Sequence, residues 1–195
     1  MPPIVDTAHP QLVVVSNRLP IAYQIAADGQ KVASLSPGGL VAALGPALAG
    51  KGVTWVGWDG TVDGSEEPLD VEGFRIEPVS LTTELIEGHY EGLSNSTLWP
   101  LFHNVGVPAQ FSASWWDSYE RANEAFAERV AMVSSEGAIV FVQDYHLMLV
   151  PALLRKRRPD LTIGYFHHIP FPHPDTMAAL EQRALVLEGL LGADI

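Results

Sequence analysis

Short apolar runs alternate with segments of helical periodicity along most of the chain. The runs are rich in Val, Ile and Phe, which is typical of buried strands. Five such runs predict strands at residues 12–15, 53–57, 74–79, 138–142 and 161–166. The intervening segments predict helices at residues 38–49, 82–91, 115–133 and 146–158, with a helical pair over 175–191. Strand-then-helix repetition of this kind predicts an α/β fold with a doubly wound, mostly parallel sheet, similar to a Rossmann domain.

Two departures from the alternation are also expected. Residues 21–26 and 31–35 flank Asp28-Gly29, a favoured turn dipeptide, and so predict a β-hairpin. Residues 59–70 are acidic and glycine-rich and predict a surface loop. In the 115–133 helix, Trp116, Tyr119, Ala122 and Phe126 share one stripe, which is more often core than binding site.

Composition and charge exclude some classes of function for this chain. The chain has 195 residues, 47% hydrophobic, which suits one globular domain. A formal net charge of −12 repels polyanions, so we expect neither nucleic acid nor an anionic membrane as a partner. The longest apolar stretch, 137–154, contains Asp144, His146 and Pro151, which argues against a membrane span. Residues 1–11 resemble no signal peptide, and we expect a cytoplasmic protein.

The chain has no cysteine and only eleven Lys and Arg residues. A disulfide framework and a thiolate site are therefore excluded. Four of the cations form the run at 155–158, where the 146–158 helix is expected to end, and solvated cations at a helix C-terminus explain it. Arg18 is different, because it stands alone at the end of the first strand. Its planar guanidinium could bind a phosphate or pair with a carboxylate, and position alone does not decide between these.

Polar side chains also follow the last two strands. Asp144 comes after the 138–142 strand, where it could contact a ligand or simply cap the next helix. His167, His168 and His173, with Asp175, follow the 161–166 strand. Adjacent strand residues point to opposite faces and two prolines precede His173, so convergence on one metal ion is not expected. No metal and no cofactor is required by the sequence.

Two further segments carry candidate binding residues. Gly38 and Gly39 lie where a helix begins, so backbone N–H groups could approach a phosphate, although a glycine pair is also a common turn. Tyr90, Trp99 and His103 fall in the polar and aromatic segment 87–104, in which Pro100 limits any helix. Such aromatic residues suit sugar rings, but core packing explains most of them.

Six motifs occur in the order found in the family of trehalose-6-phosphate synthases, glycosyltransferases of family 20. They are Ser16-Asn17-Arg18-Leu19-Pro20, Pro37-Gly38-Gly39-Leu40, Trp55-Val56-Gly57-Trp58, Leu98-Trp99-Pro100-Leu101-Phe102-His103, Asp144-Tyr145-His146 and His168-Ile169-Pro170-Phe171-Pro172. The chain therefore resembles that family over residues 13–195. It departs from the family pattern at Gln143, where the family more often has His, and at His167, where it usually has an apolar residue.

The resemblance implies roles for individual residues. Arg18 is expected to contact the phosphate of glucose 6-phosphate, with Tyr90, Trp99 and Asp144 orienting this acceptor. Gly38 and Gly39 are expected near the diphosphate of the donor, UDP-glucose, and His168 near its transferred sugar. Asp144 and His168 are thus the residues expected closest to the reaction, and His167 is expected to be structural.

The resemblance also implies an activity and a domain organisation. Family members have GT-B architecture, with two Rossmann-like domains, and transfer glucose with retention of configuration. We expect residues 1–195 to be the N-terminal, acceptor-binding domain. The C-terminal, donor-binding domain would follow Ile195 and is absent from this chain, so the isolated chain is expected to be inactive.

Two other functions fit the same sequence. The first is a related glucosyltransferase with another phosphorylated acceptor, such as glycerol 3-phosphate. The second is a non-catalytic module that binds a sugar phosphate. The sequence does not decide the donor nucleotide or the oligomeric state, and it is compatible with a homo-oligomer.

Overall fold

A six-stranded sheet forms the centre of the computed structural model, which describes residues 10–25, 31–36, 38–48, 50–103 and 106–195. The strand order is β5-β6-β4-β1-β7-β8. All neighbours pair in parallel except β5, which is antiparallel to β6. The strands are β1 (Leu12–Arg18), β4 (Thr54–Trp58), β5 (Leu69–Val71), β6 (Phe74–Pro78), β7 (Ile139–Gln143) and β8 (Thr162–Phe166). The predicted mostly parallel sheet is confirmed.

β1 lies in the middle of the sheet because both of its faces are apolar. Val13 and Val15 pack into the core on one face, and Val14 packs into the core on the other. All three side chains are fully buried. A strand that is covered on both sides reads as a continuous apolar run, which explains why β1 could be recognised from sequence.

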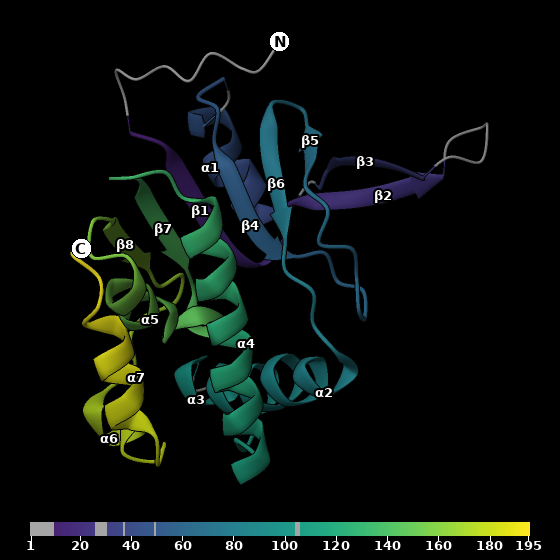
Figure 1. Ribbon diagram of the computed structural model, residues 1–195. Coiled ribbons are helices and arrows are strands. Elements are labelled where there is room, and N and C mark those ends of the chain that lie inside the picture. Colours follow the sequence, from purple (N-terminus) through teal and green to yellow (C-terminus); the bar gives the residue numbers. More distant parts are fainter. Residues whose placement is uncertain (1–9, 26–30, 37, 49, 104–105) are drawn as a thin grey trace.

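Helices cover both faces of the sheet (Figure 1). α1 packs with Val14 on one face, and α4 and α5 pack with Val13 and Val15 on the other. The helical elements are α1 (Gly39–Leu48), α2 (Thr83–Leu85), the π-helix η1 (Ile86–Leu98), α3 (Trp99–His103), α4 (Ala113–Val133), the 3-10 helix η2 (Tyr145–Leu147), α5 (Val150–Arg157), α6 (Pro174–Met177) and α7 (Arg183–Leu190). The arrangement is the doubly wound fold that the sequence predicts.

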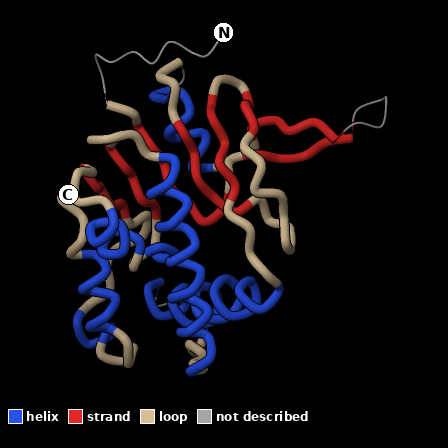
Figure 2. Tube along the Cα trace, viewed as in Figure 1, coloured by secondary structure: helices blue, strands red, loops and turns tan. Residues whose placement is uncertain are grey.

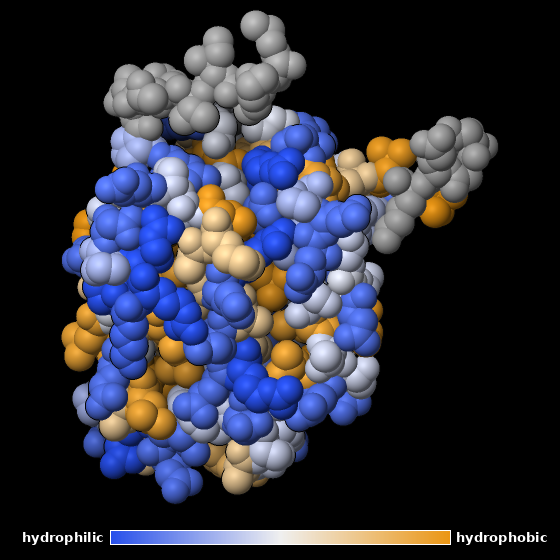
Figure 3. Space-filling view, in the orientation of Figure 1, coloured by the Kyte–Doolittle hydropathy of each residue, from blue (hydrophilic) through white to orange (hydrophobic). Residues whose placement is uncertain are grey.

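The predicted hairpin and the predicted stripe on α4 are both present. β2 (Ile21–Ile25) and β3 (Lys31–Leu35) pair antiparallel and project from the body (Figure 2). Their expected turn at Asp28-Gly29 lies outside the described residues. The inward stripe of α4 is buried, as predicted. Its outward face belongs to the largely hydrophilic surface in Figure 3. No helix within the described ranges is long and apolar enough to cross a membrane.

The segment after residue 82 corrects two sequence expectations. A helix was expected to end at Glu91, with Pro100 limiting any continuation. Instead α2, η1 and α3 follow one another without a break up to His103. Pro100 is the second residue of α3 and does not end this helical run, in which the preceding residue, Trp99, still donates its N–H to the Ser94 carbonyl. Gly88 and Gly92 bring η1 close to α4, since a Cβ at either position would overlap Ser118 or the Trp115 ring.

The helix expected over residues 146–158 is also interrupted. η2 occupies Tyr145–Leu147, and α5 begins only at Val150. Pro151 is in the first turn of α5, where proline is favoured as a helix start but not as a helix interior. The interruption leaves Asp144 and η2 at the end of β7 rather than inside a long helix.

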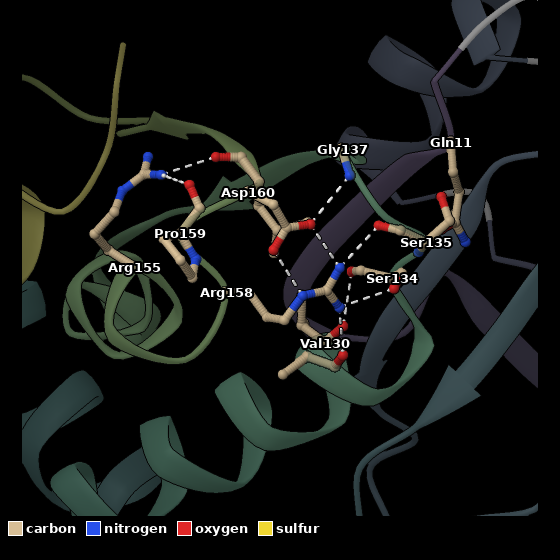
Figure 4. Close-up of polar contacts among 11 residues, drawn as sticks. Gln11, Val130, Ser134, Ser135, Gly137, Arg155, Arg158, Pro159 and Asp160 are labelled. Carbon is tan, nitrogen blue, oxygen red and sulfur yellow. Dashed lines mark hydrogen bonds and ion pairs between the residues drawn. The ribbon is translucent and has the colours of Figure 1, made fainter.

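Lys156 and Arg157 are exposed, as the sequence suggested for the 155–158 run, but Arg155 and Arg158 bond to backbone carbonyls outside α5. Arg158 donates hydrogen bonds to the carbonyl oxygens of Ala131, Ser134 and Ser135 at 2.8–3.0 Å. It also forms an ion pair with Asp160 at 2.8 Å (Figure 4). This guanidinium, together with the Gly137 N–H, holds the pKa of the Asp160 carboxyl well below its usual range. Arg158 therefore joins the end of α4 to the loop before β8.

We expect Arg158→Ala to lower the free energy of unfolding by about 2 kcal/mol, because several charge-assisted hydrogen bonds to carbonyls would be lost together. Arg157→Ala is the matched control. Among the described residues its one partner outside α5 is Glu124, and the loss of this exposed pair should cost less than about 1 kcal/mol. Urea unfolding measures both, and equal losses would contradict the joining role of Arg158.

Candidate functional site

A cleft of about 530 Å³ opens where β1, β7 and β8 end. The carboxyl edge of a parallel sheet is the usual position of a ligand site in this fold. The lining of the cleft combines one guanidinium, one carboxylate, two imidazoles, two amides and one phenol with small or apolar side chains. The lining residues are Ser16, Asn17, Arg18, Leu19, Pro20, Ser36, Gly38, Ala43, Tyr90, Gln143, Asp144, His146 and His168.

Arg18 is the last residue of β1, and its side chain lines the cleft. The Cζ atom lies over the Trp58 ring, 4.7 Å from the ring centroid, in a cation–π contact. No carboxylate in the described part of the chain forms an ion pair with it. The alternative that Arg18 serves a structural ion pair is thus not realised there, and its N–H groups remain available to an anion.

Asp144 follows β7 with an unusual backbone conformation. Its φ is +70° and its ψ is 169°, a region that is almost exclusive to glycine. The Oδ1 atom accepts a hydrogen bond of 3.0 Å from the Tyr145 N–H, so the predicted capping role is present. The same half-buried side chain lines the cleft. Strained residues of this kind cluster at functional sites, and here the cap coexists with a place in the wall of the cleft.

Two neighbouring histidines belong to this region: His146 in the wall of the cleft and His89 behind it. His146 lines the cleft, and its ring stacks on those of Tyr145 and Tyr90, with centroids 4.2 and 6.0 Å away. Desolvation by burial lowers the pKa of His146 to about 4, against the opposing effect of the Asp144 carboxylate. His89 is fully buried, and desolvation, followed by the proximity of His146, lowers its pKa to about 3. Both imidazoles are therefore neutral at pH 7.

His89 also fixes a residue of the cleft wall. Its Nε2 lies 2.9 Å from the Asn17 Oδ1. An amide oxygen only accepts, so Nε2 carries the proton in this arrangement. Tyr90, the next residue of η1, lines the cleft and meets the edge of the Trp58 ring at 5.6 Å between centroids. The π-helix thus supplies one buried support, His89, and one half-buried aromatic ring, Tyr90.

His168 and His167 separate, as expected for adjacent residues. His168 lines the cleft, and its Nε2 lies 3.0 Å from the Gln143 Oε1. The Gln143 amide donates to the Phe141 carbonyl, so Nε2 of His168 carries the proton. His167 instead contacts the Tyr165 hydroxyl at 2.9 Å and packs against Phe102. In the described residues no group of three or more His, Cys, Asp or Glu side chains could hold a metal ion.

The remaining candidates divide between the cleft and the surface. Gly38 lines the cleft and Gly39 begins α1, so the N-terminus of that helix borders the site. Trp99 is 39% exposed, and its ring lies tilted against that of His103 with centroids 4.6 Å apart. Neither Trp99 nor His103 is among the lining residues. The structure therefore brings Arg18, Gly38, Tyr90, Asp144 and His168 together and leaves Trp99 outside.

Three participants were not selected from sequence: Asn17, Trp58 and His146. Each stands in a motif quoted above, within two residues of a residue that was selected or at the end of a strand. For Trp58, only the topology of the sheet could have indicated a role. β4 is parallel to β1, and Trp58 is the register partner of Arg18. Strand order would have placed Trp58 beside Arg18, but strand order is not visible in one sequence.

Comparison with known proteins agrees with this geometry. The model of glycosyltransferase family 20 matches residues 10–195. A trehalose-6-phosphate synthase of Mycobacterium sp. (strain KMS) is 47% identical over 193 residues, 99% of this chain and 40% of that protein. The chain thus spans about 40% of the length of this curated relative.

Solved structures show the same likeness. An α,α-trehalose-phosphate synthase (UDP-forming) from Burkholderia vietnamiensis superposes with a TM-score of 0.81 at 30% identity, over 95% of this chain and 40% of that one. One from Burkholderia xenovorans, in complex with glucose-6-phosphate, gives 0.77 at 30% identity, over 94% of this chain and 39% of that one. With a family match over nearly its whole length, the chain belongs to glycosyltransferase family 20.

Proposed function

We propose that this chain is the acceptor-binding part of a glucosyltransferase that moves glucose from UDP-glucose to glucose 6-phosphate, forming trehalose 6-phosphate. The observation that carries the proposal is Arg18, a guanidinium without a carboxylate partner among the described residues, at the wall of a cleft in a family 20 fold. A relative that was solved with glucose-6-phosphate supports the choice of acceptor.

Each candidate residue is assigned a role that suits the chemistry of its side chain or backbone. Arg18 holds the phosphate, and Asp144 accepts hydrogen bonds from acceptor hydroxyls while Tyr90 covers the sugar ring. Trp99 is proposed as an acceptor contact on the family resemblance alone. Gly38 and Gly39 admit the donor diphosphate to the N-terminus of α1. His168, with Nδ1 left free by the bond to Gln143, contacts the donor sugar.

The proposed chemistry needs positioning more than a nucleophile. In a retaining front-face transfer, the acceptor hydroxyl attacks on the side that the nucleoside diphosphate leaves, and that leaving group takes the proton. The neutral His146 and the fixed Asp144 hold the acceptor in reacting geometry, which is where such a site obtains its rate. We propose that residues 1–195 form the acceptor domain of a two-domain enzyme whose other domain holds the nucleotide.

The test is calorimetric titration of this chain with glucose 6-phosphate. Arg18→Ala should weaken binding roughly ten- to a hundredfold, because one charge-assisted bidentate contact contributes about 1.5–3 kcal/mol. Arg121→Ala is the matched control, since it removes the same charge from α4, outside the cleft. Glucose itself, which has no phosphate, should bind both variants as it binds the wild type.

Two outcomes would contradict the proposal. Unchanged glucose 6-phosphate affinity in Arg18→Ala would remove the phosphate from that position. Tighter binding of glycerol 3-phosphate than of glucose 6-phosphate would keep the phosphate contact and change the acceptor.

A further inference from the structure

The guanidinium of Arg18 rests against a four-residue segment, Trp58 to Thr61, that begins with the last residue of β4 and turns away from the strand. Trp58 offers a ring face to the Arg18 Cζ at 4.7 Å. Gly60 lies directly against the same group, because a Cβ built on it would overlap Nη1, Nη2 and Cζ of Arg18. We call these two surfaces, Trp58 and Gly60, the arginine cradle.

The cradle is held rigid by its own hydrogen bonds. The Trp58 indole N–H donates to the Thr61 carbonyl at 2.7 Å, which fixes the ring relative to the turn. Asp59 Oδ1 accepts from the Thr61 N–H at 2.8 Å and from its hydroxyl at 2.7 Å. The Leu19 N–H donates to the Trp58 carbonyl at 2.8 Å and ties the turn to the residue after Arg18.

Only glycine fits at position 60. Its φ of +91° is one that other residues rarely adopt, and its missing side chain is the space that the guanidinium fills. A long arginine loses considerable rotamer entropy when it is ordered by a ligand. A side chain that is already held loses less, so the cradle prepares Arg18 for an anion in the cleft.

We propose that Gly60, with Trp58, is a positioning residue that orients the Arg18 guanidinium to receive a phosphate monoester bidentately. The inference rests on the proposed function, in which Arg18 binds the acceptor phosphate. Gly60 acts through Arg18 and is not itself a ligand contact.

The experiment compares Gly60→Ala with Gly73→Ala. Gly73 has a similar φ of +87°, but nothing lies within 4 Å of a Cβ built there. Both variants share the backbone strain, and only the first displaces Arg18. NMR reports the displacement, since protons held over an indole ring are shifted upfield. We expect Gly60→Ala to lose that shift for the Arg18 side chain and to weaken glucose 6-phosphate binding about tenfold, and Gly73→Ala to do neither.

Arg18→Lys is a second variant that leaves the turn intact. It keeps the charge but has no planar fork, so we expect it to lose nearly as much glucose 6-phosphate affinity as Arg18→Ala. Wild-type affinity in Arg18→Lys would overturn the inference, because orientation of a fork would then be unnecessary.

These experiments distinguish failure of the inference about Gly60 from failure of the proposed function. If Arg18→Ala weakens binding but Gly60→Ala changes neither the NMR shift nor the affinity, the cradle is overturned and the proposed function stands. If Arg18→Ala leaves the affinity for glucose 6-phosphate unchanged, the proposed function is overturned. The inference about Gly60 is then overturned as well, because Arg18 would not bind the phosphate.

Discussion

Asp144→Gly should be about as stable as the wild type but should bind glucose 6-phosphate roughly ten- to a hundredfold more weakly. Asp144 occupies φ +70°, ψ 169°, where a non-glycine residue is strained by about 1–3 kcal/mol. Glycine relieves that strain. It loses one capping hydrogen bond, at about 1 kcal/mol, and adds backbone entropy to the unfolded chain, at about 0.5–1 kcal/mol. These contributions to stability nearly cancel.

We expect glucose 6-phosphate to bind more weakly, because the glycine variant has no carboxylate to accept hydrogen bonds from the hydroxyls of this acceptor. Losing charge-assisted bonds of that kind costs about 1.5–3 kcal/mol. Urea unfolding and calorimetric titration measure the two effects on one sample. Asp63→Gly is the matched control, since Asp63 also has a positive φ, of 47°, but does not line the cleft.

An unfolded Asp144→Gly variant would show that the residue serves the fold. Wild-type affinity in a folded variant would show that Asp144 does not contact the acceptor. Asp144→Asn separates shape from charge, since it retains the acceptor oxygen of the cap and loses the carboxylate.

We expect the free energy of unfolding to fall steeply as the pH is lowered from about 6.5 towards about 4. Burial holds the pKa of His146 at about 4 and that of His89 at about 3 in the folded protein, while an unfolded histidine titrates near 6.5. Between these values the unfolded chain binds protons that the folded chain does not. Stability is therefore fully present above the unfolded pKa and declines as the pH falls below it.

The expected slope is large compared with the stability of a typical domain. One histidine that takes up a full proton on unfolding contributes about 1.4 kcal/mol per pH unit, so two contribute up to about 2.7. A typical domain is stable by only about 5–15 kcal/mol. Asp160 and Asp194, whose pKa values are held low by arginines and backbone N–H groups, stay ionised through this window and lose their contribution only at lower pH.

Urea unfolding at pH 7, 6 and 5 measures the slope. His146→Gln should reduce it by about 1.4 kcal/mol per pH unit, because the proton that His146 takes up on unfolding is lost. An unaltered slope in His146→Gln would mean that this imidazole is already protonated in the folded protein.

The alternation of apolar runs and helical stripes determined the fold class from sequence alone. Val13, Val14 and Val15 read as a doubly buried strand because the strand is covered on both faces. The stripe on α4 was also visible, because period and burial coincide there. The segment 82–103 was misread, since a π-helix and a proline in a first turn have no simple periodic signature.

The sequence by itself also indicated that Arg18, Asp144 and His168 end strands, and parallel topology made their approach to one edge of the sheet expected. Only the tertiary structure decided how each is held. Trp58 and Gly60 reach Arg18 from another strand, and His89 reaches Asn17 from a helix 72 residues away in sequence. Asp144 takes a backbone angle that its residue type disfavours. Such supports come from packing between distant segments, which act on one another only when the chain is folded and which a local pattern cannot encode.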